Sequence, residues 1–137
     1  MATQYSVASR TNRMSGLNTD IGINAQIIVY SGTIPASVGA ALTGTALAQF
    51  AGNATAFGAA ATGVLTASAV ASTTGAAGAG AGTVGTHYRI NTSAGVAVTQ
   101  GTCGGSGSGA DMILTNTSIA SGQAVNFTSL TITASGA

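Results

Sequence analysis

The stretch Ile21–Tyr30, with the sequence IGINAQIIVY, gives the clearest strand signal in the chain. Its apolar residues recur at every second position from Ile21 to Val29, which is the period of a β-strand with one buried face. The segment that follows, Ser31–Ala36 (SGTIPA), contains a glycine that can adopt a positive φ and a proline that cannot donate to a ladder. We therefore predict a core strand over 21–30 that ends in a turn.

The rest of the chain reads as further short strands divided by Gly-rich turns. Segments rich in β-branched or alternating apolar residues predict strands at 45–50, 64–71, 86–91, 96–103, 111–116 and 124–133. No amphipathic helix and no repeat of fixed period stands out, although residues 36–48 allow a helical turn. The Gly/Ala run at 73–85 fits either a flexible linker or a close-packed extended segment.

This pattern predicts an all-β protein with a single domain. The domain covers residues 21–137 and is a β-sandwich or barrel, because many short strands with Gly-rich turns are typical of those architectures. Residues 1–20 are polar, and we predict that they form an extended N-terminal arm.

Formal charge is almost absent from the sequence. The 137 residues include three arginines, two aspartates and neither lysine nor glutamate, so the net charge is +1. From Ile21 to Tyr88 no residue is formally charged, and His87 is the only group there that titrates near neutral pH. Charge normally keeps a small soluble domain apart from its neighbours. The composition is therefore typical of a protein whose surface lies largely within an assembly.

The apolar content supports the same interpretation. Ile, Leu, Val and Phe account for 27 of the 137 residues, and much of the remaining hydrophobic fraction is alanine, which buries little area. The 21 glycines raise the entropy cost of folding. An isolated monomer would be marginally stable, and oligomerisation would stabilise it by mass action. We expect a structural, assembling protein.

Several classes of partner lack the residues they require. Three arginines do not make the basic patch of a nucleic-acid binder. The segment Met1–Arg13 lacks the apolar run of a signal peptide, and polar residues interrupt the charge-free stretch too often for a membrane span. A single cysteine, Cys103, excludes an intrachain disulfide and fits a reducing compartment. We expect neither nucleic acid nor membrane as a partner.

Candidate catalytic groups are equally sparse. His87 and Arg89 lie on one face of the predicted strand 86–91, as a general base and an anion-binding partner would. Nothing in the sequence ties a carboxylate to His87, so a surface or interface pair is favoured over a catalytic one. Cys103 beside one unlinked histidine is a weak signal for a nucleophile.

Metal and cofactor sites also lack support. One histidine, one cysteine and two aspartates show no spacing typical of metal ligands. The glycine-rich segment 104–109 (GGSGSG) lacks the lysine of a phosphate-binding loop. We predict no enzyme activity, no catalytic residue, no metal and no cofactor.

The formal charges themselves are the candidate partner-binding residues, since ionic anchoring must come mainly from them. They are Arg10, Arg13, Asp20, Arg89 and Asp111. Arg10 and Arg13 belong to the predicted arm, which fits either a tether that docks on an acidic partner surface or a frayed terminus. Both alternatives remain open at this point.

Two neighbouring motifs carry a resemblance to a known group of proteins. Tyr30–Ala36 (YSGTIPA) and Ala41–Ala48 (ALTGTALA) resemble a Tyr-Ser/Thr-Gly-x-x-Pro-Ala … Ala-x-x-Gly-Thr-x-Leu-Ala pattern in small virion proteins of tailed bacteriophages. The likeness continues at 57–60, 63–66, 85–90, 111–112 and 121–123, and so covers most of 21–132.

Members of this group resemble capsid decoration, or cement, proteins. The resemblance implies a jelly-roll-like domain that binds the major capsid protein of the same phage on the outer capsid surface and stabilises the head. It also implies a homo-oligomer, a dimer or a trimer, that is made in the bacterial host cytoplasm and resides in the virion. The alternatives are another virion component (collar, tail or head-fibre base), a carbohydrate-binding module on the virion surface, or an ice-binding or silk-like protein.

Overall fold

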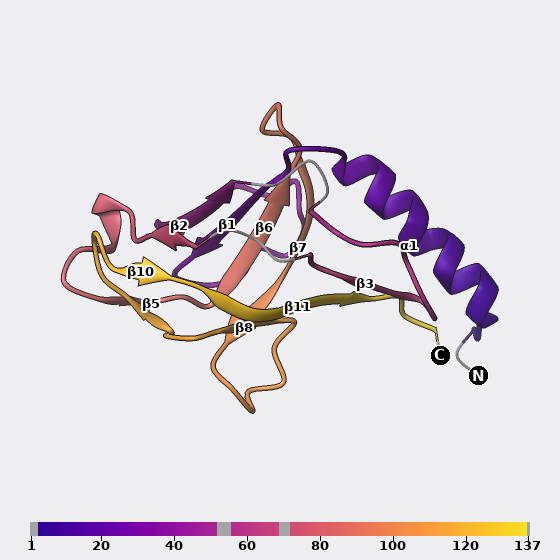
Figure 1. Cartoon of the computed structure of the whole chain (residues 1–137). Coiled ribbons are helices and arrows are strands. Elements are labelled where there is room, and N and C mark those ends of the chain that lie inside the picture. The colour runs from indigo at the N-terminus through magenta and orange to yellow at the C-terminus, as the bar shows by residue number, and fades with distance from the viewer. Residues whose placement is uncertain (1–2, 52–55, 69–71, 137) are drawn as a thin grey trace.

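The computed structural model describes residues 3–51, 56–68 and 72–136, and within these ranges it contains one α-helix and eleven strands (Figure 1). The helix α1 spans Val7–Ile21, and a short 3-10 turn, η1, spans Ala77–Ala79. The strands are β1 (Gln26–Tyr30), β2 (Ala46–Ala51), β3 (Val64–Thr66), β4 (Thr73–Thr74), β5 (Thr83–Val84), β6 (His87–Asn91), β7 (Ala97–Gly104), β8 (Met112–Leu114), β9 (Ser118–Ile119), β10 (Ala124–Val125) and β11 (Phe127–Thr133). The architecture is mainly β, which agrees with the predicted fold class in outline, but the helix α1 means that the chain is not all-β.

Seven strands form one mixed sheet in the order β2-β1-β6-β7-β8-β11-β3. All neighbours are antiparallel except β7 and β8, which run parallel. Two ribbons, β10-β4 and β5-β9, lie outside it. The sheet does not close on itself, so the barrel alternative is wrong.

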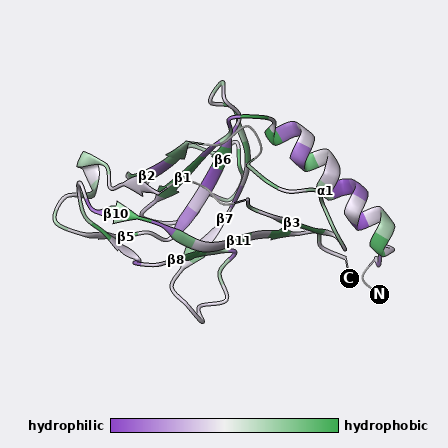
Figure 2. Cartoon of the chain, viewed as in Figure 1, coloured by the Kyte–Doolittle hydropathy of each residue, from purple (hydrophilic) through white to green (hydrophobic). Residues whose placement is uncertain are grey.

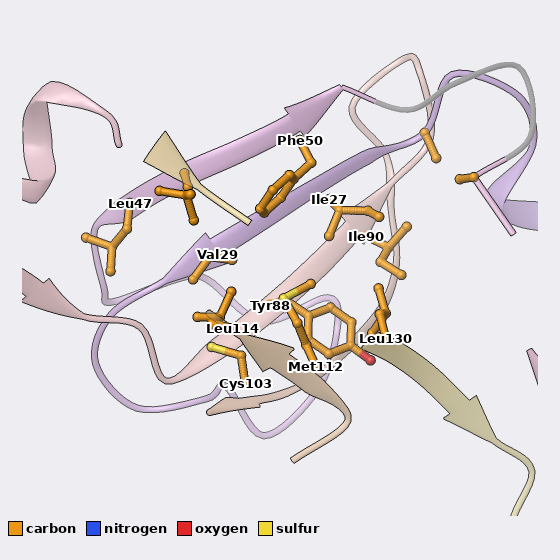
Figure 3. Packing of buried hydrophobic residues seen from close by; sticks show 14 of the residues in the cluster. Ile27, Val29, Leu47, Phe50, Tyr88, Ile90, Cys103, Met112, Leu114 and Leu130 are labelled. Carbon is orange, nitrogen blue, oxygen red and sulfur yellow. The ribbon is translucent and has the colours of Figure 1, made fainter. Parts of the chain in front are cut away.

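The sheet curls so that its two halves face each other across the core. β1, β2 and β6 contribute one side, and β8 and β11 contribute the other (Figure 3). The buried side chains include Ile27, Val29, Leu47, Phe50, Tyr88, Ile90, Met112, Leu114 and Leu130. β1 is buried along almost its whole length because it is a central strand covered on both faces. Its run of four large apolar residues reflects that position.

The prediction of an N-terminal arm is wrong, because Val7–Ile21 is helical. The side-chain oxygen of Ser6 caps the helix by accepting from the backbone N–H of Ser9 at 3.2 Å. Gly22, with φ of 70°, ends it and donates its N–H to the carbonyl of Asn18. Figure 2 shows hydrophilic segments along α1, and the apolar stripe that packs against the core is narrow.

That stripe consists of Met14, Leu17 and Ile21, at the i, i+3, i+7 spacing of one helical face. These three residues pack against the core, and Ile21 is fully buried. Ile21 therefore belongs to the helix rather than to the first strand, and Ile23 is 66% exposed. The predicted boundary between residues 20 and 21 falls inside the last turn of the helix.

Most other predicted strands are present with shifted ends. β2, β6, β7 and β8 lie within or one residue beyond the segments predicted for them. The segment 124–133 is divided into β10 and β11 at Asn126, and the segment 64–71 yields β3, with 69–71 outside the described residues. The run 73–85 contains β4, η1 and β5, so it forms two short strands and a 3-10 turn rather than a linker or one continuous extended segment. Residues 36–45 form turns and bends without a helix.

Candidate functional site

A loop lies across the face of the large sheet that points away from the core. We call Ser31–Thr45 the covering loop. Its ends are joined by hydrogen bonds from Ser31 N–H to the Thr45 carbonyl at 3.0 Å and from Thr45 N–H to Ser31 Oγ at 3.1 Å. The loop connects β1 to β2 and contains most of the motif that carries the phage resemblance.

Side chains from the neighbourhood of β6 and β7 hold this loop by its backbone carbonyls. Arg89 Nη2 donates to the Ala40 carbonyl at 3.1 Å and to Gln100 Oε1 at 3.0 Å. Gln100 Nε2 in turn donates to the Pro35 carbonyl at 2.7 Å. These partners are neutral oxygens, so the Arg89 guanidinium serves as a charged donor inside the fold.

Thr86 supplies a third anchor. Its hydroxyl donates to the Gly32 carbonyl at 2.5 Å and lies 3.1 Å from Nδ1 of His87. The imidazole stacks on the Tyr30 ring, with centroids 5.6 Å apart and an interplanar angle of 18°. The covering loop is thus fixed at three carbonyls by three side chains.

His87 and Arg89 share a strand face, as predicted, but they are not a surface pair. His87 is fully buried and Arg89 is 7% exposed. Burial lowers the pKa of His87, and the neighbouring Arg89 lowers it further. His87 is therefore a neutral imidazole at pH 7, and no carboxylate is among its hydrogen-bond partners. The imidazole is fully buried, and its neighbours are Thr86, Tyr30 and Arg89.

The other arginines lie on α1 and contact the chain itself. Arg13 Nη2 donates to the carbonyl of Ser135 at 2.7 Å, and its guanidinium lies 4.3 Å from the centroid of the Tyr5 ring. Tyr5 N–H also donates to the Gly136 carbonyl at 2.9 Å. The frayed-terminus alternative is therefore wrong, since this segment is docked on the last described residues.

Arg10 packs against the turn before β3. A Cβ on Gly63 would approach the Arg10 Cβ within 2.9 Å, so only a residue without a side chain fits there. The N–H of Gly63 donates to Thr11 Oγ1 at 2.9 Å, which fixes the same contact. Arg10 Nε is buried without a hydrogen-bond partner.

The two aspartates lie apart from each other. Asp111 Oδ2 accepts from the N–H and hydroxyl of Thr102 at 3.0 and 3.2 Å. Burial, and then the Asp111 charge, raise the pKa of Tyr88. Asp20 lies exposed in the last turn of α1. The five candidate partner-binding residues therefore occupy separate places: α1, the covered face of β6 and the segment before β8.

An open groove of about 590 Å³ lies beside Cys103, between β5, β7 and the 104–110 loop. Thr86, Thr102, Ser108 and Thr117 supply hydroxyls to its lining, and no charged or aromatic side chain lines it. Cys103 is 8% exposed, and burial raises the pKa of its thiol to about 12. The thiol stays protonated at neutral pH, which leaves it a poor nucleophile.

A cluster of metal-ligating side chains is absent from the described residues. No three His, Cys, Asp or Glu side chains come together there as metal ligands would. Within the same ranges, no helix has the length and apolarity needed to cross a membrane.

Sequence reasoning missed Thr86, Gln100 and Tyr30 as parts of the anchoring of the covering loop. These residues can be identified as anchors only when the strand register is known. The register places Tyr30 opposite His87 and Arg89 opposite Gln100.

Comparison with protein-family models, with curated proteins and with solved structures finds no match for this chain.

Proposed function

We propose that this chain is a non-enzymatic structural protein of a tailed-bacteriophage virion, of the capsid decoration type. In this proposal it is a jelly-roll-like sandwich that binds the major capsid protein on the outer surface of the head. It acts as a homo-oligomer, a dimer or trimer, and stabilises the head mechanically. It is made in the host cytoplasm and ends in the virion.

The observation that carries the proposal is the surface. The folded chain exposes 6703 Å², and its exposed charged side chains in the described residues are Arg13, Asp20 and Asp111. Surfaces of free small domains are about a quarter to a third charged residues. A surface with so few charges offers little repulsion between copies, and this favours close packing in a shell.

The exposed apolar side chains add uncharged contact area. The large ones among the described residues are Tyr5, Val7, Ile23, Ile34, Val84 and Val96, each at least 38% exposed. Contacts of this kind are individually weak. Repeated over the many equivalent sites of a capsid, and linked through an oligomer, they sum to firm attachment by multivalency.

The carbohydrate-binding alternative finds less support in the side chains. Sugar sites use exposed aromatic rings as platforms, but Tyr30 and Tyr88 are 8% and 1% exposed. The Tyr5 ring is occupied by the guanidinium of Arg13. A surface with few charges would equally suit a collar, tail or head-fibre component. The position of the protein in the virion distinguishes these roles from capsid decoration.

The test uses heads of the phage that encodes this chain, assembled with and without its gene. We expect purified protein to add to the deficient heads, to appear as regular outer density by cryo-electron microscopy, and to raise the temperature at which the heads release DNA. Heads of an unrelated tailed phage serve as the control. Density on the collar or tail would move the assignment to that structure, and full stability without the protein would refute the cement role.

A further inference from the structure

We propose that the covering loop is an acid-sensitive flap, released from the sheet when His87 takes up a proton. The proposal is independent of the proposed function, since it concerns the response of the single chain to pH. It is carried by the hydrogen-bond geometry around one fully buried imidazole.

The geometry fixes the tautomer of that imidazole. The hydroxyl of Thr86 has one proton, and its shortest contact, 2.5 Å, directs that proton to the Gly32 carbonyl. Thr86 Oγ1 can then only accept from His87, so Nδ1 carries the imidazole proton. Nε2 is the unprotonated nitrogen, and it is buried without a partner.

A second proton has no suitable place in the closed state. It would bind Nε2 and create a buried cationic N–H with no acceptor, which carries a large desolvation penalty. The imidazolium would also lie on the same strand face as the Arg89 guanidinium, whose Nε is likewise buried without a partner. The protonated ring is stable only when exposed to water.

The groups that surround His87 do not offset this penalty. From β1 the neighbour is Tyr30, which stacks on the ring and is neutral. From β6 it is Arg89, and from β7 the opposite residue is Thr102, whose hydroxyl and N–H are bound to Asp111. The covering loop itself has no titratable side chain.

Release of the ring is coupled to release of the loop through Thr86. If the imidazole leaves its place, Thr86 loses the donor that orients its hydroxyl toward Gly32, and Tyr30 loses its stacking partner. The Arg89 and Gln100 anchors hold the far side of the loop. We therefore expect opening to begin at the Ser31–Gly32 end.

The direction of the pH effect follows from proton linkage. The closed state keeps the pKa of His87 below 6.5, so the open state binds more protons. The closed state of the covering loop is most stable above about pH 6.5. Its stability falls as the pH drops below the pKa that His87 has when it is exposed to water. Because opening takes up one proton, the equilibrium constant for opening can rise by at most about tenfold for each pH unit of acidification.

Amide hydrogen exchange of the full chain, corrected for intrinsic rates, tests the proposal between pH 7 and 4.5. We expect the protection of the Ser31 amide, bonded to Thr45, to fall by up to about tenfold per pH unit below pH 6.5, while that of Ala67, bonded to Leu130, stays constant. In His87→Phe, which retains a ring to stack on Tyr30, the Ser31 protection should not depend on pH. A flat response in the wild type, or equal slopes in both proteins, overturns the proposal.

A second measurement decides the matter if His87→Phe does not fold. Nitrogen-15 NMR of the wild-type imidazole should show Nδ1 protonated and Nε2 unprotonated at pH 7. On acidification the ring should titrate together with the loss of Ser31 protection. The opposite tautomer, or protonation of His87 with the Ser31 amide still protected, overturns the proposal equally.

Discussion

The rings of Phe50 and Phe127 meet edge to face, with centroids 5.1 Å apart and an interplanar angle of 78°. Phe50 lies on β2, at one edge of the large sheet, and Phe127 lies on β11, next to the opposite edge strand. Four strands separate them in the sheet order, so this contact exists only because the sheet curls. The pair joins two strands that are not hydrogen-bonded neighbours in the sheet.

Removal of this contact should therefore destabilise the whole domain. Phe50 is 1% exposed, and Phe50→Ala should lower the free energy of unfolding by about 3–5 kcal/mol, since it leaves a cavity at the centre of the core. Urea denaturation followed by circular dichroism measures the change. Phe50→Leu is the matched control and should lose clearly less. Equal losses in the two variants would contradict this expectation and would show that the loss comes from the ring contact with Phe127 rather than from the cavity.

The covering loop should tolerate a side chain at one glycine and not at another. A Cβ on Gly44 would collide with the carbonyl of Ser31, where the two ends of the loop are joined, whereas a Cβ on Gly39 meets nothing within 4 Å. We expect Gly44→Ala to expose the loop to limited proteolysis at pH 7 and Gly39→Ala to leave it resistant. Resistance in Gly44→Ala would mean that the closure of the loop ends is dispensable.

The arginines of α1 have two roles to separate. Arg10→Ala/Arg13→Ala should weaken the docking of the protein on capsids and make it less sensitive to salt, because it removes both basic groups of the helix. The Arg13 contacts with Ser135 and Tyr5 predict an additional loss of stability of about 1–2 kcal/mol. Capsid occupancy at several salt concentrations and urea denaturation measure the two effects. If capsid occupancy is unchanged at every salt concentration, these arginines stabilise the fold and do not contribute to docking.

Cys103 should react slowly as long as the chain is folded. Its thiol is 8% exposed, with a pKa raised to about 12, so the thiolate population at pH 8 is about 10⁻⁴. We expect Ellman's reagent to modify native Cys103 at least about a hundred times more slowly than the same residue in 6 M guanidinium. Rapid modification of the native protein would show that the groove beside Cys103 opens in solution.

The sequence predicted the strands whose pattern is local and missed the features that depend on distant contacts. β6 and β7 have alternation or β-branched residues within the strand itself, so short windows suffice. Helix α1 presents only Met14, Leu17 and Ile21 to the core, too few apolar residues to stand out in a polar segment. The anchors of the covering loop join residues 49 to 65 positions apart, as Arg89 and Ala40 or Gln100 and Pro35 show, and no local pattern encodes them.

The pairing of β1 with β6 affects folding during synthesis, because the two strands are far apart in the sequence. Its partners, from Tyr30 and His87 to Gln26 and Asn91, are 57 to 65 residues apart. At a synthesis rate of roughly 5–20 residues per second, β1 leaves the ribosome about 3–13 s before its partner exists. β2 follows β1 closely and pairs with its other edge, so the β1–β2 hairpin can form early and cover half of this apolar strand. The remaining edge stays open to other nascent chains until β6 arrives, and this interval is when misassembly during synthesis is most probable.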